Sequence, residues 1–252
     1  MSAARAFVAG ATGYTGQALV RTLRERGSGV VAHVRPDSRR LAEWQQRFDA
    51  LGAAVDATPW EPTALRATLA RLQPTHVFAL LGTTRRRMRA EGGAANSYEA
   101  VDYGLTAMLL EATRAAAPAA RFVYLSAVGA SERGNAYLRV RGRVERELRA
   151  SGLSWLVARP AFITGSDREE PRAAERLASG AIDWFLQVAA RMGAGGPYQR
   201  YASLTASELA AALATLAGSA PDGVYDAAAL RAAARQPPSE GRASRRTSPG
   251  SA

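Results

Sequence analysis

Three glycines spaced three residues apart near the start of the chain constrain its fold more than any other feature. Gly10, Gly13 and Gly16 lie in the segment FVAGATGYTG, residues 7–16, which is typical of a short buried strand that turns into a helix. In such a turn the glycines provide open backbone dihedrals, close approach of the backbone to a ligand, and tight packing of helix on strand. The predicted helix continues with one apolar stripe, formed by Leu19, Val20 and Leu23.

A helix that starts at such a turn is a suitable place for a phosphate. Its first N–H groups have no partner within the helix and carry partial positive charge, so a dinucleotide pyrophosphate fits there. A plain tight turn is the alternative, because a glycine triplet alone is a weak signal. The strand before it and the amphipathic helix after it favour cofactor binding. The predicted contacts are Gly10, Thr12, Gly13, Tyr14, Thr15 and Gly16.

Strand and helix patterns alternate along the rest of the chain. Apolar runs at 30–34, 76–81, 121–126 and 154–159 predict strands, and helical periodicity separates them. This alternation predicts an α/β fold, a Rossmann-like doubly wound parallel sheet with a small C-terminal substrate-covering lobe. We expect one NAD(P)-binding domain over 1–235, with a substrate-cleft insertion at 164–204, and a disordered tail over 236–252, where the composition is too polar to form a core.

The end of the second predicted strand indicates which dinucleotide is bound. In dinucleotide folds an acidic residue there accepts from a free ribose 2′-hydroxyl, whereas an arginine favours a 2′-phosphate. Arg35 holds this position, and Arg39 and Arg40 follow it, which favours NADP(H) over NAD(H); an ordinary surface arginine is the alternative. Asp56, at the end of the third strand, is placed to accept from the adenine amino group.

Two further segments are expected beside the cofactor. The turn Leu81, Gly82 and Thr83 follows a buried strand, and its glycine allows the backbone to approach the nicotinamide ribose or the pyrophosphate. Pro160 and Ile163 follow the sixth strand and are expected along the nicotinamide edge.

A serine, a tyrosine and a cation suggest proton transfer at the same sheet edge. Ser126 ends the fifth strand, where ligands bind in parallel sheets, although such a serine is more often a simple cap. Tyr137 and Arg141 are four residues apart and share one helix face. In this arrangement the serine orients a carbonyl, the tyrosine transfers the proton, and the cation lowers the pKa of the phenol.

These motifs together resemble the atypical short-chain dehydrogenases/reductases, and more narrowly the subgroup around the HIV Tat-interacting oxidoreductase and its bacterial relatives. The resemblance covers roughly residues 5–225 and rests on the glycine turn and on LGTTR at 81–85, VDY at 101–103, LSAVGA at 125–130, YLRVRGRVE at 137–145 and Arg159-Pro160. It implies a Rossmann domain that binds NADP(H), with a Ser/Tyr/Lys set where this chain has Ser126, Tyr137 and Arg141.

Arg141 departs from that pattern. The family's lysine hydrogen-bonds the nicotinamide ribose and relays a proton, and an arginine cannot lose its proton in the working pH range. Arg141 can still hold the ribose and stabilise a phenolate by its charge. Two function classes therefore stay open: an oxidoreductase that transfers hydride to or from a small carbonyl or alcohol, and a redox sensor that binds NADP(H) and acts through a protein partner.

Composition excludes several other classes. The chain has no cysteine and two histidines, so no disulfide or thiolate site can form and we expect no metal site. The formal charge of +11 comes entirely from arginine, which is scattered through every segment. We therefore expect no nucleic-acid partner, and read the run at 85–89 as a solvated loop. No apolar run of membrane length occurs, so we expect a cytoplasmic protein that does not bind membranes. We also expect a monomer or homodimer. The Ser126 and Tyr137 arrangement favours a small-molecule carbonyl substrate.

Overall fold

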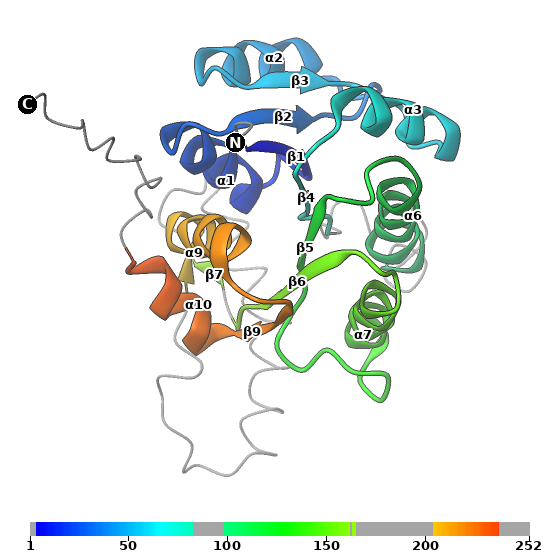
Figure 1. The fold of residues 1–252 in the computed structure, drawn as a ribbon, viewed down its shortest axis with the longest axis vertical. Coiled ribbons are helices and arrows are strands. Elements are labelled where there is room, and N and C mark those ends of the chain that lie inside the picture. Colours follow the sequence, from blue (N-terminus) through cyan, green and yellow to red (C-terminus); the bar gives the residue numbers. More distant parts are fainter. Residues whose placement is uncertain (1–3, 83–97, 162, 165–203, 237–252) are drawn as a thin grey trace, which may run out of the picture.

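Seven parallel strands form one sheet in the part of the chain that the structure describes (Figure 1). The computed structural model describes residues 4–82, 98–161, 163–164 and 204–236. The strands of the sheet are β1 (Arg5–Ala9), β2 (Gly29–His33), β3 (Ala54–Asp56), β4 (His76–Ala79), β5 (Arg121–Leu125), β6 (Ser154–Arg159) and β9 (Gly223–Asp226). Their order is β3-β2-β1-β4-β5-β6-β9, and every pair is parallel. The predicted doubly wound α/β fold is confirmed.

Helices cover both faces of this sheet (Figure 1). One face packs against α1 (Tyr14–Glu25), α2 (Leu41–Ala50), α9 (Ala206–Ser219) and α10 (Ala227–Ala234). The other face packs against α3 (Pro62–Leu72), α6 (Thr106–Ala116) and α7 (Ala136–Arg149). Because both faces are covered, the strands are apolar on both sides, which is typical of a parallel sheet.

Successive residues of each strand enter the two cores in turn. In β1, Phe7 belongs to the core under α3 and α6, and Val8 to the core under α1 and α9. Val77 and Phe78 of β4 divide in the same way. His33 is 3% exposed and packs between aromatic rings, as expected for a strand residue.

The strand order reverses direction between β1 and β4. The chain passes from β1 outward to β2 and β3, then returns to the other side of β1 as β4. In open α/β sheets, ligands bind beyond the carboxyl ends of the strands at such a reversal. The glycine turn after β1 and the turn after β4 are therefore the two loops that flank the expected ligand site.

The helix before β5 differs from the expected regular helix. Residues Tyr98–Leu105 form a π-helix, η1, which continues into α6. A π-helix has wider turns than an α-helix, so the side chains before and after it no longer follow one regular stripe. Asp102 and Thr106 are fully buried in this region, while Leu105 is only half-buried.

The C-terminal helices start at side-chain caps. The hydroxyl of Thr205 accepts from the backbone N–H of Glu208, and the Glu208 carboxylate accepts from the backbone N–H of Thr205, which fixes the start of α9. The sequence analysis did not identify α10. Its signal was present, because Asp226 caps the helix and an alanine-rich run follows.

Several expectations lie outside the described residues: the contact of Thr83, the arginine run at 85–89, most of the insertion at 164–204, and the tail beyond residue 236. The two segments that flank the insertion at 164–204 pair as a small parallel sheet, β7 (Ile163–Thr164) and β8 (Leu204–Thr205). Among the described helices, none is both long and apolar enough to cross a bilayer.

Candidate functional site

The glycine turn between β1 and α1 has the geometry that its spacing predicts. Gly10 has a positive φ of 85°, and a Cβ at this residue would lie 2.6 Å from the carbonyl oxygen of Leu80. A Cβ at Gly16 would lie 2.1 Å from the carbonyl oxygen of Gly10. Real Cβ contacts are longer than this, so both positions require glycine: the first for the turn against β4, the second for packing α1 on the turn.

Gly13 differs from the other two glycines because it is exposed and lies in extended backbone, with a φ of −74°. Among the described residues, a Cβ there would meet only the carbonyl oxygen of Gly10 within 4 Å, at 3.2 Å. It caps α1 without a side-chain hydrogen bond. Within the described residues, the direction of a Cβ at Gly13 is otherwise unobstructed, and the backbone at this helix start is exposed.

The residues beyond β2 and β3 have partners of their own. Arg35 is exposed and forms a 3.4 Å ion pair with Asp37. Arg40 binds Glu43 through both carboxylate oxygens. The Asp56 carboxylate accepts from the backbone N–H of Thr58 at 3.1 Å and from its hydroxyl at 2.9 Å. The adenine contact of Asp56 therefore stays a prediction.

Arg141 joins the ends of two strands to the π-helix. Its Nη1 donates to the carbonyl oxygen of Leu125 at 2.6 Å and to the hydroxyl of Tyr124 at 3.2 Å. Its Nη2 donates to Oδ1 of Asp102 at 2.5 Å and to the carbonyl oxygen of Leu81 at 3.2 Å. The side chains of Arg141 and Asp102 are 6% and 0% exposed, so this is a buried ion pair. The guanidinium is held by the protein itself.

The charge of Arg141 is stabilised by these neighbours. Burial disfavours the charge, but the oxygens of Tyr124, Tyr137 and Asp102 outweigh this effect, so the pKa of the guanidinium lies above its usual value. Burial raises the pKa of the Tyr124 hydroxyl, so this group stays protonated. Nε of Arg141 is buried and has no hydrogen-bond partner within the described residues.

Tyr137 lies in the first turn of α7, directly against this cation. The guanidinium carbon of Arg141 is 5.1 Å from the centre of the Tyr137 ring. On its other side, the ring of Tyr98 lies 5.3 Å away, and the Tyr137 side chain is half-buried. Asn135 caps the helix by accepting from the backbone N–H of Leu138 at 3.0 Å. The structure therefore brings Tyr137 and Arg141 together, as the sequence predicts.

Ser126 is also buried, but its hydroxyl faces α7. It donates to Oε1 of Glu145 at 2.6 Å. Glu145 in turn accepts from Arg159 at 2.8 and 2.6 Å and from Arg149 at 3.0 Å. The sequence analysis placed Ser126 beside the substrate and gave Glu145 no role.

The turn after β4 lies between the glycine turn and Arg141. Leu80 packs against Gly10, and the carbonyl oxygen of Leu81 accepts from Arg141. A Cβ at Gly82 would lie 3.4 Å from Nη2 of Arg141. This turn therefore connects the predicted pyrophosphate end of the site with the predicted catalytic end.

The segment after β6 lies close to the loop that follows β5. Pro160 is buried, and its carbonyl oxygen accepts from the backbone N–H of Val128 at 3.1 Å. Ile163 pairs with Leu204 in the two-stranded sheet. The nicotinamide contacts of Pro160 and Ile163 stay predictions.

Comparisons with known proteins agree with a dinucleotide site at this edge. Residues 10–181, more than half of the chain, match a protein family described as NAD(P)H-binding. The chain belongs to this NAD(P)H-binding family. The match begins at Gly10, the first of the three glycines in the turn between β1 and α1.

Curated relatives of this family member include fungal organelle proteins. Protein fmp52, mitochondrial, of Aspergillus clavatus is 34% identical over 174 residues, which cover 66% of this chain and 69% of the relative. The fmp52 protein of Aspergillus fumigatus is 31% identical over 194 residues, covering 74% of this chain and 76% of the relative. A chloroplastic divinyl chlorophyllide a 8-vinyl-reductase of Oryza sativa subsp. indica is 38% identical over 149 residues, which cover 57% of this chain and 35% of the relative. Because relatives are named mitochondrial, they do not confirm the expected cytoplasmic location.

Solved structures with the same fold include an enzyme with bound NAD+ and a nucleotide-sugar epimerase. The Bordetella bronchiseptica enzyme WbmH, solved in complex with NAD+, superposes with a TM-score of 0.63 at 16% identity, covering 89% of this chain and 76% of that chain. The UDP-Glc/GlcNAc 4-epimerase of Campylobacter jejuni superposes with a TM-score of 0.62 at 12% identity, covering 91% of this chain and 82% of that chain. At these identities the likenesses show the fold alone, the Rossmann-like α/β fold that these enzymes share.

The residues of the family member fit a nicotinamide dinucleotide. The exposed backbone at Gly13, the close packing at Gly10 and Gly16, and the buried Nε of Arg141, which has no hydrogen-bond partner among the described residues, all lie along one edge of the sheet. When bound, such a cofactor supplies or accepts a hydride.

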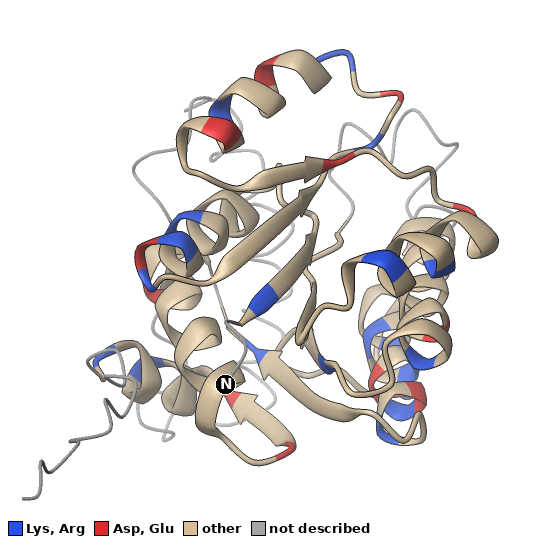
Figure 2. Ribbon diagram, turned by 45° about the horizontal axis from the view of Figure 1, so that its top comes forward, with Lys and Arg blue, Asp and Glu red and all other residues tan. Residues whose placement is uncertain are grey.

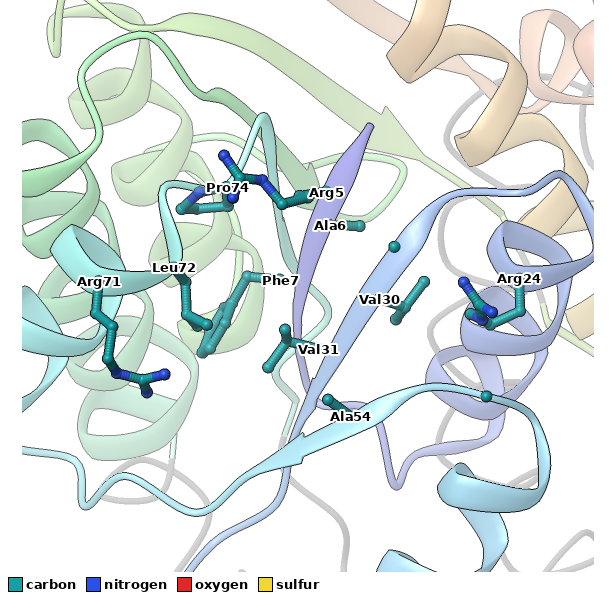
Figure 3. Close-up of a pocket in the computed structure, with 12 residues that line it drawn as sticks. Arg5, Ala6, Phe7, Arg24, Val30, Val31, Ala54, Arg71, Leu72 and Pro74 are labelled. Carbon is teal, nitrogen blue, oxygen red and sulfur yellow. The ribbon is translucent and has the colours of Figure 1, made fainter. Parts of the chain in front are cut away.

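A pocket lies at the opposite edge of the sheet, where β1, β2 and β3 begin (Figure 3). Its volume is about 330 Å³, and three arginines line it. Arg24 donates to the carbonyl oxygens of Leu51 and Ser28, and lies on the opposite side of the sheet from Arg71 (Figure 3). Because ligands of parallel sheets bind at the carboxyl ends of the strands, this hollow is not the cofactor site.

Charged residues are interleaved along the helices of the described chain (Figure 2). Many arginines face an acidic partner, as in the pairs Arg40–Glu43, Arg114–Glu111, Arg143–Glu147 and Arg146–Glu132. The positive charge of the described residues is therefore dispersed over several elements and partly balanced locally.

Proposed function

We propose that this family member is an NADP(H)-dependent oxidoreductase that reduces a small carbonyl compound, or runs the reverse reaction on its alcohol. The observation that carries the proposal is Tyr137, a half-buried tyrosine held against the charged Arg141, which in turn binds the carbonyl oxygen of Leu81 in the turn after β4. The resemblance of the chain's motifs to the subgroup around the HIV Tat-interacting oxidoreductase supports the same reaction class. A cytoplasmic monomer or homodimer remains part of the proposal.

The arrangement suits proton transfer to a substrate oxygen. The Tyr137 hydroxyl would give its proton to the oxygen as the carbonyl is reduced, and the fixed charge of Arg141 would stabilise the resulting phenolate. Arg141 cannot pass on a proton itself, so water would return the proton to Tyr137. The guanidinium carbon also lies 5.6 Å from the centre of the Tyr124 ring, and the Arg141 side chain is buried, which limits the access of water to the charge.

The cofactor site is tested by a valine at Gly13. Gly13→Val should fold, because the backbone conformation at this position suits any residue, but should abolish NADPH binding, because the side chain would fill the approach to the helix start. Fluorescence titration with NADPH measures the effect. Gly218→Val is the matched control, since a Cβ at Gly218 has no neighbour within 4 Å and lies in α9. NADPH binding by Gly13→Val at native affinity would place the cofactor elsewhere.

The preference for NADP(H) is assigned to Arg35. Its exposed ion pair with Asp37 is weak, so a 2′-phosphate can take the place of the carboxylate. Arg35→Ala should weaken NADPH binding about 10- to 100-fold, as expected for a hydrogen bond between charged groups, and leave NADH binding almost unchanged. Arg114→Ala, on α6, serves as the control. Equal affinity of the native protein for NADPH and NADH would refute the assignment of an NADP(H) preference to Arg35.

A second function, an NADP(H)-binding sensor without turnover, is favoured by one observation. The four hydrogen bonds of the Arg141 guanidinium all go to groups of the protein, so none of these donors reaches a ribose. A sensor would bind NADPH through the glycine turn and pass on its state through a protein contact. It would consume no NADPH on any aldehyde or ketone.

A further inference from the structure

Glu145 is a buried carboxylate at the centre of a polar cluster beside the proposed site. It is 1% exposed and lies in α7, two turns after Tyr137. Its Oε1 accepts from the Ser126 hydroxyl at 2.6 Å and from Nε of Arg159 at 2.8 Å. Its Oε2 accepts from Arg159 at 2.6 Å and from Arg149 at 3.0 Å. Both oxygens of the carboxylate therefore accept hydrogen bonds from groups of the protein.

The contact with Glu145 uses the one proton that Ser126 can donate. A serine hydroxyl has a single O–H, and an ionised carboxylate only accepts. Hydrogen bonds of this length to a charged group are stronger than those between neutral groups. To orient a carbonyl, Ser126 would have to give up this bond and leave a buried acceptor with one partner fewer.

The same cluster fixes the loop that leads to Tyr137. Arg159, at the end of β6, also donates to the carbonyl oxygen of Ala130 at 3.1 Å. The backbone N–H of Ser126 donates to Ala158 at 2.8 Å. The loop from Ser126 to Ala130 is thus attached to both α7 and β6 before it reaches the helix start that carries Tyr137.

From this geometry we infer that Ser126 is a positioning residue bound to Glu145, and that the substrates are activated carbonyls such as electron-poor aldehydes. The inference rests on the proposed function. Of the two hydroxyls predicted to contact the substrate oxygen, Tyr137 alone keeps its proton for that purpose. Removing one such donor from an active site typically costs about 10²–10³-fold in kcat, so a carbonyl of higher intrinsic reactivity suits this site.

The reduction balances with the groups named. The carbonyl carbon gains a hydride from the reduced nicotinamide, and the carbonyl oxygen gains the proton of the Tyr137 hydroxyl. The products are the alcohol and the oxidised nicotinamide, and water reprotonates Tyr137. Ser126 and Glu145 exchange no proton with the substrate.

The contact itself is tested by stability rather than activity. Ser126→Ala, Glu145→Leu and the double variant are compared with the native protein by thermal unfolding. We expect strong coupling, so that Ser126→Ala lowers the midpoint in the native background and has little further effect beside Glu145→Leu, which has no oxygen to accept from the hydroxyl. If Glu145→Leu does not fold, Glu145→Gln provides the second background: its amide oxygen still accepts, but the bond to an uncharged group is weaker, so Ser126→Ala should lower the midpoint less than in the native protein. Additive shifts in midpoint would overturn the inference.

The role in catalysis is tested with 4-nitrobenzaldehyde as the activated carbonyl and cyclohexanone as the unactivated one. Ser126→Ala should lower kcat/KM on the aldehyde less than tenfold and leave the Kd for NADPH unchanged, and the native protein should favour the aldehyde. A loss of 100-fold or more with NADPH binding intact would overturn the inference and leave the proposed function standing. Tight NADPH binding with no turnover of either compound would instead refute the proposed function and the substrate class together, while the unfolding experiment still decides the contact.

Discussion

Replacing Asp102 with asparagine should lower the free energy of unfolding by about 3–5 kcal/mol, because it leaves a buried guanidinium without its counter-charge. Asp102 is 0% exposed and accepts from Nη2 of Arg141 at 2.5 Å. The remaining partners of that guanidinium are the carbonyl oxygens of Leu81 and Leu125 and the hydroxyl of Tyr124, none of which carries a negative charge. Arg141 would keep its bonds to the two strand ends but lose its ionic link to the π-helix.

Urea unfolding of Asp102→Asn, Arg141→Met and the double variant measures this effect. The double variant should be more stable than the sum of the single losses predicts, because removing both charges leaves no unpaired ion. Glu111→Gln is the matched control: it breaks the Arg114–Glu111 pair, whose side chains are 53% and 61% exposed, and should leave the midpoint almost unchanged. Additive losses, or a native midpoint for Asp102→Asn, would show that the ion pair does not support the fold.

Replacing Tyr137 with phenylalanine should reduce turnover of a carbonyl substrate by about 10²–10⁴-fold, which is the usual contribution of a positioned proton donor. The ring contacts with Tyr98 and Arg141 do not involve the hydroxyl, so the fold and the NADPH affinity should be kept. The loss should appear in kcat and in kcat/KM equally, because the interaction is made in the transition state.

Tyr103→Phe is the control for this change. Tyr103 lies on η1, and its hydroxyl donates to Glu147 at 2.9 Å on the outer side of α7, away from Arg141. It should keep the native rate. Native turnover by Tyr137→Phe would show that the proton comes from another group, and a parallel loss of NADPH binding would show that Tyr137 supports the cofactor site instead.

The fold could be predicted because its determinants are local. The positions of Gly10 and Gly16 depend on contacts within the turn and with the neighbouring strand, and the alternation of apolar strands with helical stripes follows short sequence periods. The helix that carries Tyr137 and Arg141 was predictable for the same reason, since residues four apart on a helix share a face.

The partners of the site residues could not be predicted in this way. Arg141 meets Asp102 across 39 residues and Ser126 meets Glu145 across 19. Both contacts depend on how helices pack on the sheet, and the inward position of Asp102 depends on the π-helix, which no local pattern indicates. Glu145 was visible as a glutamate of the family motif, but only the packing of α7 shows that its carboxylate takes the proton of Ser126.

The central claim is that this NAD(P)H-binding protein transfers hydride to a carbonyl, and isotope transfer tests it most directly. The native protein is incubated with 4-nitrobenzaldehyde and NADPH that carries deuterium at the transferable position, and the alcohol is analysed by mass spectrometry. The account predicts one deuterium on the former carbonyl carbon, formed at similar rates by the native protein and Tyr103→Phe, about 10²–10⁴-fold more slowly by Tyr137→Phe, and not by Gly13→Val. Unlabelled or absent alcohol, under conditions where NADPH is shown to bind, would contradict the account and support the sensor.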